Sequence, residues 1–312
     1  MIKKARRFFC RHLRKFRFLP PQFYAKIHYE YFSGKQLDLN NPEDFNAKLE
    51  WYKVFFRPKI LNTLVDKYEV RDFIKGTIGE QYLNDIYGVY DNVDDIDFSI
   101  LPNKFVIKAT HSSGHNIIVT DKTTINESQV RKKLKKWLKV NQYYRMGQEW
   151  AYKDVTPRYI IEKFLKEDDK TSLVDYKYYC FNGKPIFIDV HLDREEDHKQ
   201  GCFDLDFKLL PFGKSKSYKS ISSDLKKPSN LNEMTQLAEI LATDLPFVRV
   251  DFYSVNGRTV FGEMTFYPSD ARKKFYPEEY NKVIGDYLNL PQLNNAKDPI
   301  TSLEGITYAT KS

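Results

Sequence analysis

Residues 249–263 read Arg-Val-Asp-Phe-Tyr-Ser-Val-Asn-Gly-Arg-Thr-Val-Phe-Gly-Glu, a pattern that predicts a β-hairpin. Apolar and polar residues alternate toward Asn256-Gly257, a pair typical of a tight turn between antiparallel strands. Strand pairing across this turn would bring Asp251 close to Glu263. Close carboxylates repel unless one is protonated or a cation lies between them, and Mg²⁺ carried by a nucleotide phosphate prefers such oxygen ligands. A solvent-facing hairpin with ordinary polar residues is the alternative.

The composition predicts a folded chain with a separate basic N-terminus. The 312 residues are 41% hydrophobic and 15% aromatic, so about two domains with a buried core are expected. The formal net charge is +8, and the eight Lys and Arg residues before Pro20, with no acid among them, account for all of it. Because the remainder is neutral, we expect no nucleic-acid partner, which would require basic residues over a folded face.

The first 19 residues predict a membrane-surface segment. Their cations are interspersed with apolar side chains that fit a short amphipathic helix, namely Ile2, Phe8, Phe9, Leu13, Phe16 and Phe18. We expect residues 1–19 to bind an anionic membrane surface without spanning it, because no stretch approaches the roughly 18 to 20 apolar residues of a transmembrane helix. The arginines also interrupt any signal-peptide core. In the alternative, the phenylalanines pack onto the body of the protein.

The cysteines indicate neither a disulfide framework nor a zinc site. Cys10, Cys180 and Cys202 are odd in number and widely spaced, which favours a reducing cytoplasm. Cys180 lies within an apolar strand pattern and is expected to be a buried structural thiol. No Gly-x-Ser-x-Gly elbow is present. The sequence therefore offers no obvious protein nucleophile.

Hydrophobic periodicity predicts an α+β chain. Helices are predicted after Asn41 and over residues 61–74, 125–138, 231–242 and 276–288. Strand patterns occupy residues 105–108, 116–120, 159–165, 177–190 (two strands joined at Asn182-Gly183), 203–209 and 247–266. Several hairpins among helices favour this class over a doubly wound parallel sheet. Residues 166–172 and 215–229 are expected to be the most mobile loops.

Residues 108–116 form a candidate phosphate-binding loop. Lys108 ends a strand and is followed by Ala-Thr-His-Ser-Ser-Gly-His-Asn, so backbone N–H groups can approach a phosphate while the lysine supplies charge. Neither the dinucleotide fingerprint nor the Walker pattern is present. We interpret His111 and His115 as hydrogen-bonding residues of the loop more than as catalysts.

Six stretches resemble, in the right order, the ATP-grasp superfamily and more closely its TupA-like branch from bacterial surface-polysaccharide gene clusters. They are Asp66-Lys-Tyr-Glu-Val-Arg71 with Ile78-Gly79, Phe105-Val-Ile-Lys-Ala-Thr-His-Ser-Ser-Gly-His-Asn116, Ile161-Glu-Lys-Phe-Leu165, Asp175-Tyr-Lys-Tyr-Tyr-Cys-Phe-Asn-Gly-Lys-Pro185, Arg249-Val-Asp-Phe-Tyr253 and Gly262-Glu-Met-Thr-Phe-Tyr-Pro268. The resemblance implies two α+β subdomains, 101–163 and 164–312, whose antiparallel sheets sandwich a nucleotide. The basic segment 1–19 and a mostly helical region, 20–100, would precede them.

The resemblance also implies three sets of site residues. The first would bind ATP: Lys67, Lys108, Ser112, Ser113, Gly114, Glu162, Lys163, Phe164 and Leu165. The second would bind Mg²⁺: Asp251, Glu263 and Thr265, the last in place of the usual asparagine. The third would act in catalysis: Arg249 and Lys177. Ordinary surface or ion-pair roles are the alternative for Lys67, Lys108, Lys177 and Glu162.

The preferred hypothesis is an ATP- and Mg²⁺-dependent carboxylate–amine ligase that forms an amide through an acyl phosphate. Its carboxylate, from a hexuronic acid or an amino acid, and its amine would be glycan-linked substrates in capsule or lipopolysaccharide assembly. We expect a cytoplasmic protein, peripheral on the inner face of the bacterial cell membrane. One alternative is a nucleotide-sugar glycosyltransferase, since Asp204-Leu-Asp206 has the Asp-x-Asp spacing. The other is a non-catalytic nucleotide-binding scaffold.

Overall fold

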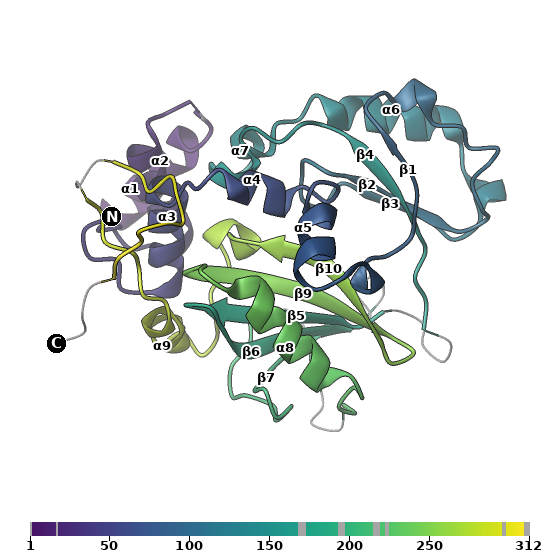
Figure 1. The fold of residues 1–312 in the computed structure, drawn as a ribbon. Helices are drawn as coiled ribbons and strands as arrows, with labels where there is room; N and C mark the ends of the chain where they lie inside the picture. The colour runs from purple at the N-terminus through teal and green to yellow at the C-terminus, as the bar shows by residue number, and fades with distance from the viewer. Residues whose placement is uncertain are drawn as a thin grey trace.

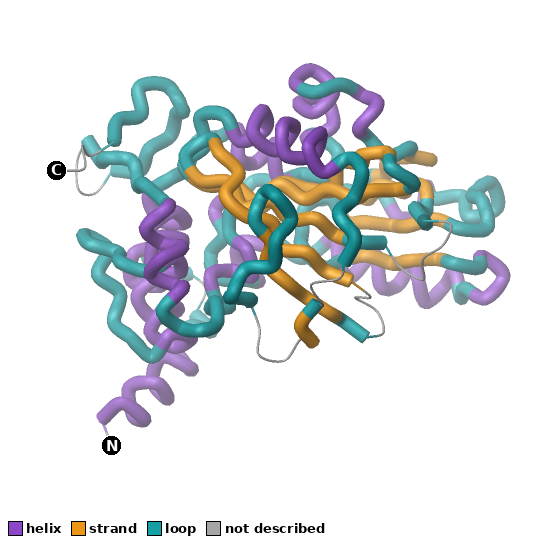
Figure 2. The backbone as a smooth tube through the Cα atoms, turned by 90° about the horizontal axis from the view of Figure 1, so that it is seen from below, coloured by secondary structure: helices purple, strands orange, loops and turns teal. Residues whose placement is uncertain are grey.

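The chain folds into two β-sheets with helices around them. The computed structural model describes residues 2–16, 18–167, 173–192, 197–214, 219–221, 225–294 and 298–308. The sheets form separate layers, and Figures 1 and 2 show helices gathered at one end of the strands. Mainly antiparallel sheets mixed with helices confirm the α+β prediction. In the described part of the chain, no helix is both long enough and apolar enough to cross a bilayer.

The helices of the N-terminal third form a group at the end of the sheets (Figure 1). α1 (Ile2–Leu13) packs on α2 (Pro21–Ser33), and α2 packs on α3 (Phe45–Phe55). α3 also packs on α9 (Tyr280–Tyr287), which is shorter than the predicted helix over residues 276–288. α3 begins where Asp44 Oδ1 accepts a hydrogen bond from the Ala47 amide at 2.9 Å.

The single helix predicted over residues 61–74 is wrong, because the chain breaks there into two helices. α4 (Ile60–Val65) ends at Asp66, whose backbone is extended (φ −73°, ψ 119°), and α5 (Val70–Thr77) follows. The Asp66 carboxylate accepts hydrogen bonds from the amides of Tyr68 at 2.7 Å and Glu69 at 3.2 Å. An aspartate that bonds nearby amides in this way competes with helix continuation. The break places Lys67 beside the loop at residues 110–114.

The first sheet has the strand order β1-β4-β2-β3, with all neighbours antiparallel. Its strands are β1 (Ile86–Tyr90), β2 (Phe105–Ala109), β3 (Asn116–Val119) and β4 (Tyr159–Lys163). The predicted β2–β3 hairpin is confirmed, whereas β1 was not predicted. Helix α6 (Glu127–Leu138) covers this sheet, and its Leu134 shares a buried core with Phe105 and Tyr159.

The second sheet has the order β10-β9-β5-β6-β7-β8 and packs against α8 (Leu231–Ala242). Its strands are β5 (Asp175–Phe181), β6 (Lys184–Leu192), β7 (Lys199–Phe203), β8 (Lys219–Ser220), β9 (Phe247–Val255) and β10 (Arg258–Thr265). The predicted hairpin is confirmed, because Asp251 in β9 lies opposite Glu263 in β10. Positive φ angles at Asn256 (51°) and Gly257 (81°) fit its predicted turn.

Some predicted elements are shifted or lie outside the described residues. The strand predicted over residues 203–209 instead ends at Phe203, and Leu209 only bridges back to Phe203. Of the two loops expected to be mobile, residues 168–172, 215–218 and 222–224 are not described. The domain boundaries at residues 19, 100 and 163 stay predictions.

Candidate active site

A cleft of about 410 Å³ takes side chains from both sheets. β2, β3 and β4 contribute from the first sheet, and Asp175 of β5 and Tyr253 of β9 contribute from the second. The lining residues are Asn84, Val106, Lys108, Asn116, Ile118, Glu162, Lys163, Phe164, Leu165, Lys166, Leu173, Asp175 and Tyr253. Five of the predicted ATP-binding residues are therefore among the lining: Lys108, Glu162, Lys163, Phe164 and Leu165.

An ion pair stands on the first-sheet side of the cleft. Lys108 Nζ lies 2.7 Å from Glu162 Oε2 on the neighbouring strand. Burial alone would raise the pKa of Glu162, but the charge and hydrogen bond of Lys108 lower it, so the carboxylate is ionised. Asn84, which precedes β1, donates to the Lys163 carbonyl at 2.8 Å and so supports the end of the neighbouring strand β4. The lysine is thus held beside the cleft with its charge partly compensated.

Lys67 closes the loop that was predicted to bind phosphate. Its Nζ donates to the Ser112 carbonyl at 2.8 Å. The Ser112 hydroxyl is buried and lies 2.8 Å from His115 Nδ1, and the His115 ring stacks on Trp137 with centroids 4.5 Å apart. Gly114 adopts a left-handed φ of 75°, which favours glycine. These contacts agree with the prediction that His115 is a hydrogen-bonding residue of the loop. They also keep the Ser112 side chain buried.

The pKa of Lys67 is affected by charged residues of both sheets. Burial lowers the pKa of Lys67, the charge of Glu263 opposes this effect, and the charge of Lys108 adds to it. Both groups must therefore lie close enough to Lys67 to act on its charge. Glu263 belongs to the second sheet and Lys108 to the first. The charge of one residue from each sheet therefore acts on Lys67.

The acidic centre lies on β9 and β10 and is compensated by cations. Arg249 donates through Nε to Asp251 Oδ1 at 2.6 Å and through one terminal nitrogen to Glu263 Oε1 at 2.9 Å. Lys177 of the adjacent β5 lies 2.5 Å from Asp251 Oδ2. Thr265 Oγ1 accepts from Arg249 at 3.1 Å. All five of these residues, predicted as metal or catalytic residues, are brought together.

Neighbouring cations keep Glu263 ionised. Burial in the site would raise its pKa, but Arg249, followed by Lys67 and Lys177, lowers it to about 2. The side chain is still 36% exposed, whereas that of Asp251 is 3% exposed. Glu263 therefore offers a charged and reachable oxygen at neutral pH, next to the more deeply buried Asp251.

The donor set fits magnesium that arrives with a nucleotide. In the described ranges, no group of three or more His, Cys, Asp or Glu side chains could hold a metal ion unaided. Asp251 and Glu263 supply two carboxylates, and Thr265 Oγ1 lies 3.3 Å from Glu263 Oε1. Mg²⁺ is commonly held by one or two carboxylates together with waters and substrate phosphates. These residues suit that mode of binding.

The Asp-x-Asp motif serves a local structural purpose. Asp204 Oδ1 accepts hydrogen bonds from the amides of Asp206 at 3.0 Å and Lys208 at 2.8 Å. A side chain that bonds the backbone two residues on in this way forms an Asx-turn. The Asp206 side chain is 79% exposed. Neither aspartate lines the cleft. The turn therefore gives no support to a sugar-nucleotide site at this position.

Sequence reasoning missed several residues that the structure brings to the site. Asn84, Asn116 and Tyr253 line the cleft, although only their places near strand ends could have suggested it. A buried ionic network of His28, Glu50, Lys53 and Asp270 was also missed. No motif links these four residues: Glu50 and Lys53 lie three positions apart on α3, but His28 and Asp270 lie far from them in the chain.

Comparison with known proteins identifies the family. Residues 47–289 match the TupA-like ATPgrasp family. A comparison with curated proteins gives no match. Among solved structures, D-alanine–D-alanine ligase from Bacillus anthracis complexed with ATP is 15% identical, with 73% of this chain and 63% of that chain covered and a TM-score of 0.39. The chain thus spans less than two thirds of that ligase.

Two further solved structures are similar at comparable levels. D-Alanine–D-alanine ligase from Helicobacter pylori is 14% identical, with 81% of this chain and 68% of that chain covered and a TM-score of 0.42. Phosphoribosylamine–glycine ligase from Thermotoga maritima is 12% identical, with coverage of 67% and 50% and a TM-score of 0.38. The family match covers well over half of the chain. The chain therefore belongs to the TupA-like ATP-grasp family.

Proposed function

We propose that the protein is an ATP- and Mg²⁺-dependent ligase that joins a carboxylate to an amine. The observations that carry this proposal are Lys108 in the lining of a cleft between the two sheets, and the carboxylates of Asp251 and Glu263 on the second sheet, which Arg249 contacts together. A triphosphate needs cations around its phosphates, and a metal held by acids on the far side completes the charge balance.

The proposed roles are assigned from the residues that line the cleft and from the contacts of the acidic centre on β9 and β10. Lys67 and Lys108 bind phosphate oxygens, and Phe164 and Leu165 border the base. Asp251, Glu263 and Thr265 hold Mg²⁺, which when bound neutralises phosphate charge. Arg249 and Lys177 stabilise negative charge on the transferring phosphoryl group and on the acyl phosphate.

The reaction needs no protein nucleophile. The γ-phosphoryl group passes from ATP to a carboxylate oxygen, which releases ADP and forms an acyl phosphate. The amine nitrogen then attacks the acyl carbon. The C–N bond forms as the C–O bond to phosphate breaks, inorganic phosphate leaves, and the amine releases a proton to solvent. Cationic side chains around the site lower the cost of both charged steps.

The finer proposal is that the substrates belong to a surface glycan or its precursor at the inner face of a bacterial membrane. The N-terminal segment supports it. Phe8, Phe9, Phe16 and Phe18 are 65%, 62%, 62% and 86% exposed, whereas Cys10 is buried toward α2. Exposed aromatic side chains next to a run of basic residues suit an anionic lipid surface. An anchor of this kind would raise the local concentration of lipid-linked substrates.

Nucleotide binding and trapping of the acyl phosphate test the proposal. Thermal stability is measured with Mg²⁺–ATP and with UDP-sugars, and hydroxylamine is used to convert acyl phosphates to hydroxamates across a panel of hexuronic and amino acids. We expect stabilisation by Mg²⁺–ATP and carboxylate-dependent hydroxamate with ADP. Glu263→Gln should abolish hydroxamate formation, whereas Glu239→Gln, on the exposed face of α8, should not.

Two results would contradict the ligase, and a third would contradict only the metal assignment of Glu263. Stabilisation by UDP-sugars alone would favour a glycosyltransferase. Stabilisation by Mg²⁺–ATP without any hydroxamate would favour a nucleotide-binding scaffold. Full activity in Glu263→Gln would remove Glu263 from the metal site.

A further inference from the structure

Lys214, which lies beyond β7 in the chain, is a deeply buried lysine. Its side chain belongs to a residue that is 5% exposed. Its Nζ donates to the Tyr179 hydroxyl on β5 at 2.6 Å. The rings of Tyr179 and Phe275 also lie close, with their centroids 5.1 and 5.4 Å from Nζ. The charged end of this side chain is therefore enclosed by the protein.

The contact with Tyr179 places Lys214 next to the acidic centre. Tyr179 lies directly opposite Arg249, and Lys177 lies opposite Asp251 two residues along the same strands. Residues two apart in a strand share a face, and directly opposite residues have Cβ atoms about 5 Å apart. Arg249 and Lys177 both contact Asp251, so this face carries the acidic centre. The Tyr179 ring stands on the same face, and Lys214 Nζ is bonded to it.

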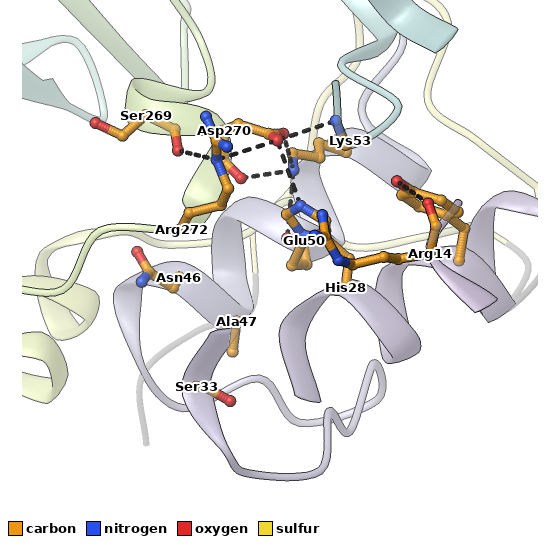
Figure 3. A network of polar contacts seen from close by, with 12 residues as sticks. Arg14, His28, Ser33, Asn46, Ala47, Glu50, Lys53, Ser269, Asp270 and Arg272 are labelled. Carbon is orange, nitrogen blue, oxygen red and sulfur yellow. Dashed lines mark hydrogen bonds and ion pairs between the residues drawn. The ribbon is translucent and has the colours of Figure 1, made fainter. Parts of the chain in front are cut away.

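A carboxylate does not compensate the charge of Lys214. Among the residues that the structure describes, none forms an ion pair with it. Figure 3 shows the contrasting case of Lys53, which is 2% exposed and lies 2.7 Å from Asp270 Oδ1 and 3.3 Å from Glu50 Oε1. An ammonium group that is buried beside a hydroxyl loses hydration without gaining an ion pair. Burial of this kind favours the neutral amine.

Charged and titratable groups face Lys214 from every strand or segment packed against it. They are Tyr179 of β5, Asp189 of β6, Cys202 of β7, Arg249 of β9 and Lys273 of the segment after β10. Burial lowers the pKa of Lys214, Asp189 raises it and Arg249 lowers it, and the resulting pKa is about 7. Asp189 compensates Lys214 only in part, because its Oδ1 also accepts from Gln200 at 2.6 Å.

The amide-forming step of the proposed reaction needs a proton acceptor. The amine nitrogen becomes positively charged as it attacks the acyl carbon, and it must then lose a proton. The nearby carboxylates are poor acceptors, since Arg249 donates to both Asp251 and Glu263 and the pKa of Glu263 is about 2. Buried lysines, in contrast, commonly serve as bases because desolvation makes the neutral amine available near pH 7.

We propose that Lys214 is the base of the amide-forming step and accepts the proton of the amine nitrogen above β5 and β9. The C–N bond forms, the C–O bond to phosphate breaks with its electron pair on the phosphate oxygen, and the lone pair of Nζ takes the proton. The Lys214 ammonium releases this proton to solvent after the amide and phosphate leave. Tyr179 holds Nζ in position. This inference rests on the proposed ligase function and adds a residue to the same site.

Two nucleophiles test the inference in the full-length protein. The protein receives Mg²⁺–ATP, the carboxylate that gives most hydroxamate, and either hydroxylamine or the best amine from a panel of amino acids and amino sugars. Hydroxylamine is neutral at pH 7 and attacks acyl phosphates without a base. Lys214→Met should lower the ratio of amide to hydroxamate rates by about 100-fold, the lower end of a general-base contribution. Lys208→Met, whose lysine is 77% exposed, should leave the ratio unchanged.

Arginine at the same position separates a base from a cation that binds an anion. Arginine keeps the positive charge but does not lose its proton in proteins, so Lys214→Arg should have a ratio as low as that of Lys214→Met. Stabilisation by Mg²⁺–ATP checks that both variants fold and bind nucleotide. Recovery of the ratio in Lys214→Arg would assign anion binding and overturn the inference. An unchanged ratio in Lys214→Met would overturn it as well.

A titration of the lysine side chains is independent of which amine the protein accepts. ¹³C NMR of wild type with labelled lysine should show a resonance that titrates near pH 7 and is missing from Lys214→Arg. Persistence of that resonance in Lys214→Arg, or its absence from wild type, would overturn the inference alone. Absence of hydroxamate with every carboxylate in wild type would overturn the ligase function and the inference together.

Discussion

Replacement of Lys53 by methionine should be the most destabilising of the simple charge removals in this protein. Lys53 Nζ makes three polar contacts, to Asp270 Oδ1 at 2.7 Å, to the Asp270 carbonyl at 3.1 Å and to Glu50 Oε1 at 3.3 Å. The side chain is 2% exposed. Methionine preserves most of the volume but removes the lysine charge that both carboxylates share, so that His28 alone of the network contacts Asp270 and Glu50.

Removal of one partner from a buried ion pair costs about 3 to 5 kcal/mol, because the remaining charge stays buried without compensation. For a chain of this size we expect Lys53→Met to lower the thermal midpoint by roughly 5 to 10 °C. The matched control is Lys75→Met, which removes a pair of similar length, 2.6 Å to Glu80, on an exposed surface. The control should unfold like wild type.

Urea and thermal unfolding followed by circular dichroism measure both variants. Equal stability of Lys53→Met and Lys75→Met would refute the reasoning, because it would mean that burial of the network has no energetic consequence. The double replacement Lys53→Met with Asp270→Asn should recover part of the loss, since it removes the charge that the first replacement leaves unpaired.

Two further predictions concern pH and membranes. The folded state holds a proton on Glu149, whose pKa is raised from 4.5 to about 8 by burial and Asp270, and the unfolded state releases it. Stability should therefore fall as pH rises from about 5 to 8, and Glu149→Gln should flatten this slope in urea titrations. The protein should co-sediment with anionic but not neutral vesicles and lose this binding without residues 1–19. Equal binding to both vesicle types would contradict the anchor.

Turn residues and hydrophobic spacing predicted the elements whose structure depends on residues close together in the chain. The β9–β10 hairpin was predicted because Asn256-Gly257 favours a positive-φ turn and the flanking residues alternate. Helix α8 has the predicted bounds because its apolar spacing is regular. The turn also predicted that Asp251 would lie near Glu263, and a β-bulge between Phe261 and Glu263 shifts the register so that the two residues pair directly.

Other elements depend on contacts that periodicity does not encode. β1 lies at the edge of its sheet and its residues are only partly buried, so no strong alternation marks it. The helix break at Asp66 depends on its carboxylate bonding two nearby amides. The pairing of Lys177 with Asp251 depends on the register of β5 against β9, which no sequence spacing fixes.

The buried network was the least predictable feature. His28 and Asp270 are 242 positions apart, and Lys53 and Asp270 are 217 apart. In sequence, His28 reads as one aromatic residue of an amphipathic helix and Lys53 as a surface lysine. Only the packing of α2 and α3 against the segment after β10 makes them partners.

Calorimetric titration of ATP with and without Mg²⁺ tests most directly whether the acidic pair receives a metal-loaded triphosphate. We expect wild type to bind ATP more tightly when Mg²⁺ is present. Glu263→Gln should lose most of that enhancement, while Glu239→Gln should keep it. An equal Mg²⁺ enhancement in wild type and Glu263→Gln would contradict the proposed site.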